Sequence, residues 1–219
     1  MPNGHYNPDV HKYIVEHWLG GYILKAPPWR IGIRHPRFND ENFQSHVDRF
    51  SDGQFIGDRR AANFGICTTL RTSQIRHGGI LPWLDIISDK SLAGHEPEGS
   101  WLYIVLMWVH PNYRRRGMGS AFIRACSALA VRKNLRGIYV VGLLKGYEKH
   151  LDEMDVSSYW HKVRLGKIYD PVVSLFLKRG FRDVSFYPVV PDCFDEPNSG
   201  GAGVLLFWKN YLFDSGKVI

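Results

Sequence analysis

The chain has 219 residues and a formal net charge of +7, and 44% of its residues are hydrophobic. A chain of this length and composition can bury one large core, which excludes an intrinsically disordered or fibrous protein. Its longest uncharged apolar run, Trp101 to Val109, is far too short for a bilayer, which needs about 20 residues. The first residues lack the basic and apolar regions of an export signal, so we expect a cytoplasmic protein with no membrane partner.

The cysteines and the basic charge narrow the possible classes further. Cys67, Cys126 and Cys193 form no CxxC pair and no zinc-type cluster with histidines, so we expect reduced thiols and no metal site. The positive charge favours an anionic partner, and nucleic acid is one candidate. However, the basic residues are scattered except at Arg114–Arg116, and few aromatic residues alternate with them. We therefore expect no nucleic-acid partner.

The first part of the chain predicts both helices and strands. Asn7, Pro8 and Asp9 have the pattern of a helix start, so residues 1–28 are expected to form an N-terminal helical extension. We further expect a strand over residues 29–34, a helix from residue 39 to 50, a β-hairpin over 54–57 and 61–70, and a short helix over 81–87.

The second part of the chain predicts a parallel strand–helix–strand unit. Residues 101–109 have the continuous apolar character of a central strand, a helical periodicity follows over 117–134, and 137–144 is a further buried strand. Residues 145–169 are polar and irregular, and we expect a long loop on the substrate side there. A helix over 170–179 and strands over 181–190 and 203–208 complete a single domain over residues 1–219.

The most informative segment joins the central strand to its helix and runs from Arg114 to Ser120. The first turn of a helix has backbone N–H groups without partners, and the macrodipole makes them attractive to an anion. Gly117 and Gly119 lack side chains that would keep a pyrophosphate away, and three arginines add charge. The segment lacks the Walker A pattern and the third glycine of a dinucleotide fingerprint. A basic turn with glycines for chain reversal is the structural alternative.

This segment also resembles a family motif. Arg114-Arg115-Arg116-Gly117-Met118-Gly119, after Val109 and Pro111, is similar to the acyl-CoA motif of the GNAT N-acyltransferases, and Lys178-Arg179-Gly180-Phe181 resembles their second marker. A closer resemblance, over roughly residues 30 to 210, is to GNAT domains that are often fused to carbon–nitrogen hydrolases. Five short segments in the same order carry it: Phe50–Phe55, Asn134–Gly137, Lys145–Tyr147, Ile168–Val173 and Gly203–Leu206.

The resemblance implies both a fold and a function. The implied fold is α/β (α+β), with a mixed, strongly twisted sheet of about seven strands, helices on both faces and a splayed central strand pair. The implied function is transfer of an acyl group, acetyl first, from acetyl-CoA or another acyl-CoA to the amine of a small molecule. A peptide or protein amine as acceptor and a CoA-binding module without catalysis are the alternatives. Monomer and homodimer both stay open.

The resemblance also implies the site. Leu106 and Phe176 stand where related enzymes often have an acidic residue and a tyrosine, so neither usual proton carrier is expected. We choose His150 as the catalytic base, with Tyr147 as a second catalytic candidate, because a histidine is partly neutral near pH 7. Asp170 is expected to cap a helix rather than act as an acid. The implied CoA contacts are Met107, Trp108, Val109, Arg114, Arg115, Arg116, Gly117, Met118, Gly119, Ser120, Phe176 and Lys178.

Overall fold

The computed structural model describes residues 38–59, 62–73, 88–184, 188–190 and 201–216. The predicted N-terminal extension over residues 1–28, the strand over 29–34 and the short helix over 81–87 lie outside the described residues.

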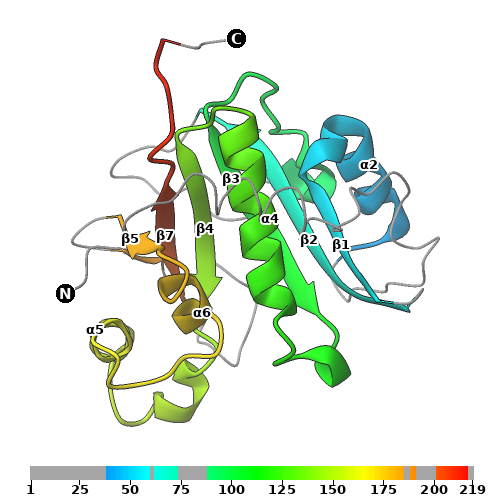
Figure 1. Ribbon diagram of the computed structural model, residues 1–219. Coiled ribbons are helices and arrows are strands. Elements are labelled where there is room, and N and C mark those ends of the chain that lie inside the picture. Colours follow the sequence, from blue (N-terminus) through cyan, green and yellow to red (C-terminus); the bar gives the residue numbers. More distant parts are fainter. Residues whose placement is uncertain (1–37, 60–61, 74–87, 185–187, 191–200, 217–219) are drawn as a thin grey trace.

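The described residues form one mixed sheet of seven strands (Figure 1). Its order is β1-β2-β3-β4-β7-β5, and β6 also pairs with β7. Only β3 and β4 run parallel, while the other pairs are antiparallel. The mixed sheet expected from the resemblance is therefore confirmed. The strands are β1 (Gln54–Arg59), β2 (Ala62–Thr72), β3 (Trp101–Val109), β4 (Gly137–Leu143), β5 (Arg182–Asp183), β6 (Val189–Val190) and β7 (Gly203–Lys209).

Helices cover both faces of this sheet, as expected. The helix that follows β3 lies across one face (Figure 1), where Phe122 and Leu129 pack with Ile104 and Val140. On the other face, Phe43 packs with Tyr103, Val105 and other inward residues of the strands. The helices are α2 (Asp40–Phe50), α4 (Met118–Arg132), α5 (Val156–Arg164) and α6 (Val173–Leu177).

The central strands β3 and β4 diverge halfway along their length. Their parallel pairing ends at Ile104 and Val140, after which β3 continues along β2 and β4 continues along β7. In the register with β2, Thr68 faces Leu106 and Thr69 faces Ile104, so Val105 is an extra residue in β3. Such a β-bulge bends its strand and increases the local twist. The bulge thus turns the end of β3 away from β4 and gives the expected splayed pair.

Side-chain packing shows the same bulge. The consecutive residues Val105 and Leu106 both pack in the core on the α2 face, whereas Ile104 and Met107 pack on the α4 face. In a regular strand neighbouring side chains point to opposite faces, so one residue must be inserted here.

Three predictions about the second half of the chain need correction. Residues 145–169 are not an irregular loop, because they contain a short helical turn over Tyr147–His150 and the helix α5. The side chain of Asp155 accepts from the Ser158 N–H and caps α5. The helix predicted over 170–179 is reduced to α6, and the strand predicted over 181–190 consists of the short strands β5 and β6.

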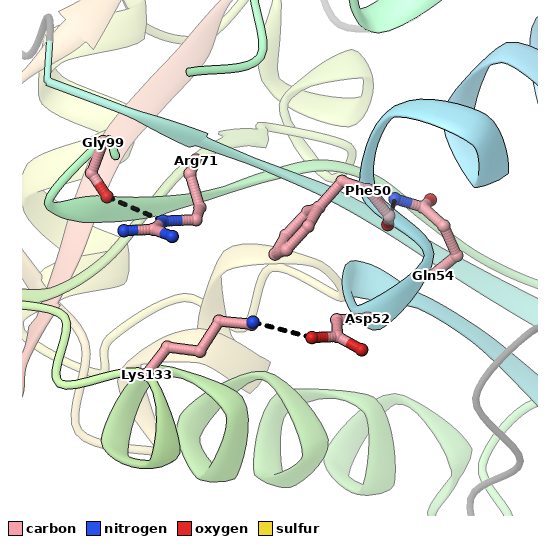
Figure 2. A network of polar contacts seen from close by, with 6 residues as sticks. All are labelled: Phe50, Asp52, Gln54, Arg71, Gly99 and Lys133. Atoms are coloured by element: carbon pink, nitrogen blue, oxygen red, sulfur yellow. Dashed lines mark hydrogen bonds and ion pairs between the residues drawn. The ribbon is translucent and has the colours of Figure 1, made fainter. Parts of the chain in front are cut away.

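A polar network anchors the far end of α4 to the connection between α2 and β1 (Figure 2). Lys133, which caps α4, forms an ion pair with Asp52 at 2.6 Å, and its hydrogen bond lowers the pKa of Asp52. A Cβ at Gly53 would collide with the Phe50 ring and with Thr69 Oγ1, so only glycine fits. The segment Phe50–Phe55, part of the resemblance, therefore has a structural role here, since it holds α4 in place.

Candidate functional site

The loop between β3 and α4 is braced by its own side chains. His110 Nδ1 accepts from the Asn112 N–H at 3.3 Å and caps the single helical turn Pro111–Tyr113. The Arg114 Nε–H donates to the Val109 carbonyl at 3.1 Å, and the Arg116 guanidinium lies 5.4 Å from the centroid of the Tyr113 ring. These contacts fix the start and the end of the loop, although the arginines themselves stay exposed.

The first turn of α4 offers backbone N–H groups to an external acceptor. The first bond of the helix runs from the Ala121 N–H to the Gly117 carbonyl, so the three N–H groups before Ala121 have no acceptor within the helix. Gly117 is the N-cap, and it supplies no side-chain capping bond. Its φ of 86° lies in the left-handed region, and a Cβ there would meet nothing within 4 Å. Glycine is thus favoured by the left-handed backbone of this turn, and the space beside it is open.

This uncapped end distinguishes α4 from the other described helices. Asn39 caps α2, and Asp155 caps α5. The Asp170 carboxylate accepts from the N–H groups of Val172 and Val173 at the start of α6. The first turn of α4 also contains no acidic residue. An anion would therefore meet three N–H groups that have no acceptor within the helix, together with the positive end of the helix dipole.

The charge around this turn is positive, and no carboxylate of the residues that the structure describes forms an ion pair with it. Arg114, Arg115 and Arg116 are all exposed. Within the described part of the chain, the ion pairs are Lys133 with Asp52, Arg164 with Asp183 and His150 with Glu153, and none involves these arginines. Arg115 has a φ of 60°, which is costly for a residue with a side chain and is often found where a ligand is held.

Gly119 has a packing role that the sequence did not indicate. A Cβ at Gly119 would lie 2.8 Å from Leu175 Cδ2 and 3.9 Å from Met107 Sδ. The missing side chain thus makes room for α6, while a contact of Gly119 with a pyrophosphate stays a prediction. Leu175, which the sequence did not single out, is the residue that α6 places beside the first turn of α4.

The end of α6 adds a further residue to this turn. The Arg179 guanidinium donates to Ser120 Oγ at 3.2 Å from Nε and at 2.9 Å from Nη2. Lys178, the predicted contact next to it in the chain, instead lies 5.2 Å from the centroid of the Tyr169 ring. The two residues belong to the same marker, and the sequence alone could not say which of them reaches α4.

The predicted contacts on β3 alternate between the two faces of the sheet. Met107 and Val109 pack on the α4 face, and Trp108 packs on the α2 face. Phe176 is only 3% exposed and meets Phe181 edge to face at 5.2 Å, so its ring is part of the core under α6. A role for Phe176 in CoA binding stays a prediction.

The predicted catalytic residues follow β4. Because β3 and β4 are parallel, their C-terminal ends lie at the same edge of the sheet, so this segment and the loop after β3 share that edge. His150 Nδ1 lies 2.7 Å from Glu153 Oε2, a partner that the sequence did not indicate. Tyr147 is buried, and its hydroxyl already donates to the Met154 carbonyl at 3.0 Å. Their catalytic roles stay predictions.

Asp170 organises this edge. It is fully buried, and its Oδ2 accepts from the Gly146 N–H at 2.8 Å and from the Tyr159 hydroxyl at 3.1 Å. Burial and the Asp170 charge raise the pKa of Tyr159, so that hydroxyl stays protonated. His150 lies against the Tyr159 ring at 5.4 Å. The prediction that Asp170 caps a helix is confirmed by its bonds to the start of α6.

A metal or membrane role finds no support in the described residues. They contain no group of three or more His, Cys, Asp or Glu side chains that could hold a metal ion. Of the helices that the structure describes, none is both long and apolar enough to cross a membrane.

Comparison with known sequences connects this site to a family. Residues 74–149 match the model of the acetyltransferase (GNAT) family. "Probable hydrolase YhcX" of Bacillus subtilis (strain 168) is 32% identical over 171 residues, which are 78% of this chain but only 33% of that relative. "Uncharacterized N-acetyltransferase YkwB" of the same organism is 27% identical over 176 residues, 80% of this chain and 76% of the relative. The chain thus spans about a third of the first relative and most of the second.

Two solved structures have the same fold. The "GphF GNAT-like decarboxylase in complex with isobutyryl-CoA" matches with a TM-score of 0.64 over 94% of this chain and 97% of that chain, at 19% identity. The loading GNATL domain of CurA from Lyngbya majuscula matches with a TM-score of 0.64 over 78% of this chain and 83% of that chain, at 14% identity. At these identities the likeness establishes the fold alone.

Proposed function

Because residues 74–149 match the model of the acetyltransferase (GNAT) family, we propose that the chain transfers an acyl group, acetyl first, from acyl-CoA to the amine of a small molecule. The observation that carries the proposal is the first turn of α4, where Gly117 leaves three N–H groups uncapped beside three exposed arginines. Such a turn suits a pyrophosphate. A solved structure of the same fold is a complex with isobutyryl-CoA, which supports this ligand class.

The divergence of β3 and β4 suits the rest of such a ligand. In our proposal the pantetheine arm runs from the first turn of α4 along β3 toward the bulge at Val105, where the two strands separate. Binding both reactants at this gap would replace an encounter in solution by a positioned one, which contributes much of the rate in reactions of this kind. A backbone N–H of β3 would stabilise the negative charge that develops on the thioester oxygen.

His150 is our choice for the base. An alkylamine with a pKa near 10.4 is protonated at pH 7 and must lose a proton before its nitrogen attacks the carbonyl carbon. If Glu153 accepts from the Nδ1–H of His150, the Nε2 atom is left as the basic nitrogen, which is the arrangement that a general base needs. The leaving CoA thiolate has a pKa of about 8.5 and needs less help, so water would serve where Phe176 offers no donor.

A CoA-binding module without catalysis is the second candidate. The observation that favours it is the apolar character of the two positions where an acid or base would act, Leu106 on β3 and Phe176 on α6. A CoA-binding module would use the same predicted CoA site as the acyltransferase, but it would show no turnover. As the cellular location we propose the cytoplasm, because the free thiols of Cys67 and Cys126 suit a reducing compartment.

The decisive experiment follows release of free CoA thiol. The protein is incubated with acetyl-CoA and longer acyl-CoAs against a panel of small amines, and in parallel against peptides with a free N-terminus. We expect turnover with one class of small amine. Turnover with peptides alone would move the acceptor to proteins. CoA binding in a titration without turnover by any pair would favour the binding module.

A further inference from the structure

A second basic cluster lies on the flank of α4, beyond the phosphate loop. Arg179 comes from the end of α6, and its guanidinium donates twice to Ser120 Oγ. Arg124 follows Ser120 by four residues on α4, and residues four apart lie on the same face of a helix, with about 5–6 Å between their Cβ atoms. The two guanidinium groups therefore share one flank of α4.

The two arginines are close enough to affect each other. Burial, and then the charge of Arg179, lower the pKa of Arg124. Two like charges on one flank repel each other, and a bound anion would remove that repulsion. Arg179 forms no ion pair with any described carboxylate, and its bonds to Ser120 use a neutral hydroxyl. Its positive charge thus remains available to a ligand.

We propose that Arg179 and Arg124 bind the 3′-phosphate of CoA. This inference rests on the proposed function, because it takes the pyrophosphate to lie at the first turn of α4. Arg124 lies one helical turn, about 6 Å along the axis, beyond Ser120 in that turn. A phosphate monoester carries about −1.5 to −2 charges near pH 7, and the planar guanidinium group matches its oxygens in a bidentate manner. The ribose 3′-phosphate is the one phosphate of CoA outside the pyrophosphate.

The assignment is tested by titrating CoA and dephospho-CoA, which differ only in the 3′-phosphate. We expect the wild type to bind CoA about tenfold more tightly, which corresponds to about 1.4 kcal/mol. Arg179→Ala and Arg124→Gln should each weaken CoA binding by about tenfold and change dephospho-CoA binding by less than about twofold. Arg132→Ala removes the same charge at the other end of α4 and should leave both affinities unchanged. Thermal unfolding without ligand checks the fold of each variant.

Three other results would have distinct meanings. An equal loss of affinity for both ligands would overturn the assignment, because Arg179 would then act on the pyrophosphate or on the packing of α6. Equal binding of both ligands by the wild type would also overturn it, while the CoA site itself would stand. If the wild type bound neither ligand, the proposed function would fail together with this inference.

Discussion

Gly117 gives the sharpest test of the phosphate loop. Its left-handed φ of 86° and the open space around it mean that Asp or Asn can be introduced without a collision. Both residues tolerate this backbone region better than other side chains, and both would cost about 1 kcal/mol relative to glycine. Because the two side chains have nearly the same shape, Gly117→Asn is a matched control for the charge that Gly117→Asp adds.

The size of the effect follows from the electrostatics of an exposed turn. A carboxylate about 4 Å from one phosphate charge is repelled by about 1 kcal/mol in bulk water and by about 4 kcal/mol near a protein surface. Since Gly117 is exposed, the repulsion between a carboxylate at residue 117 and the phosphate should lie between these limits. We therefore expect Gly117→Asp to bind CoA roughly 5- to 700-fold more weakly than Gly117→Asn.

The assay is a titration of CoA at two salt concentrations. Added salt screens exposed charges, so the difference between the two variants should shrink as the ionic strength rises. Equal CoA affinities for the two folded variants at low salt would refute the reasoning, because no phosphate could then lie near residue 117.

Three further predictions concern the catalytic edge, the core and the glycine beside α6. His150→Ala should lower kcat by about 100-fold or more, and Glu153→Ala should lower kcat with little change in KM. Unchanged kcat values in a turnover assay would show that His150 and Glu153 do not act as the catalytic base and its partner. Burial lowers the pKa of His46 from 6.5 to about 4, so the folded state binds fewer protons than the unfolded state between these values. The contribution of His46 to the free energy of unfolding should therefore be fully present above about pH 6.5 and fall by about 3 kcal/mol as the pH drops toward 4. In urea unfolding, His46→Gln should weaken this dependence of the free energy of unfolding on pH. Gly119→Ala should destabilise the fold by about 1–3 kcal/mol, and Leu175→Ala should relieve part of that cost; strictly additive effects in thermal unfolding would show that the two positions do not touch.

The parts of the fold that follow local rules could be predicted from the sequence. The strand Trp101–Val109 matches β3, because its continuous apolar run is long and clear. The helix after it was also predicted, since its apolar residues recur at helical spacing. Gly117 was correctly placed at the start of that helix, where glycine permits the left-handed turn. Local geometry decides each of these features.

The helix α5 shows a signal that was present but not recognised. Asp155 is a typical N-cap, and the buried residues Tyr159, Trp160 and Val163 recur at helical spacing after it. The many charged residues around them made the segment look like a loop. The charges lie on the exposed side of a short helix, and the aromatic pair forms part of the core.

Other features of the site depend on contacts between distant parts of the chain. Arg179 and Ser120 are 59 residues apart, and nothing in either local sequence indicates that they meet. The sequence also does not indicate the bulge at Val105, because Val105 and Leu106 are both apolar and a continuous apolar run predicts a regular strand. The pairing of His150 with Glu153 depends on the turn between them, which a polar sequence does not reveal.

The gap between β3 and β4 is held by the pairing of each strand with its other neighbour and by α6, whose packing against α4 and β4 needs a glycine on each of them. Beyond the bulge, β3 is paired with β2, while β4 is paired with β7 over its whole length. Helix α6 fits beside α4 and β4, because a Cβ at Gly119 would meet Leu175 and a Cβ at Gly142 would lie 2.7 Å from Val173 Cγ1. A larger residue at either glycine would push α6 outward and carry Arg179 away from Ser120. The packing of α6 and the position of the second basic cluster therefore depend on the same two glycines.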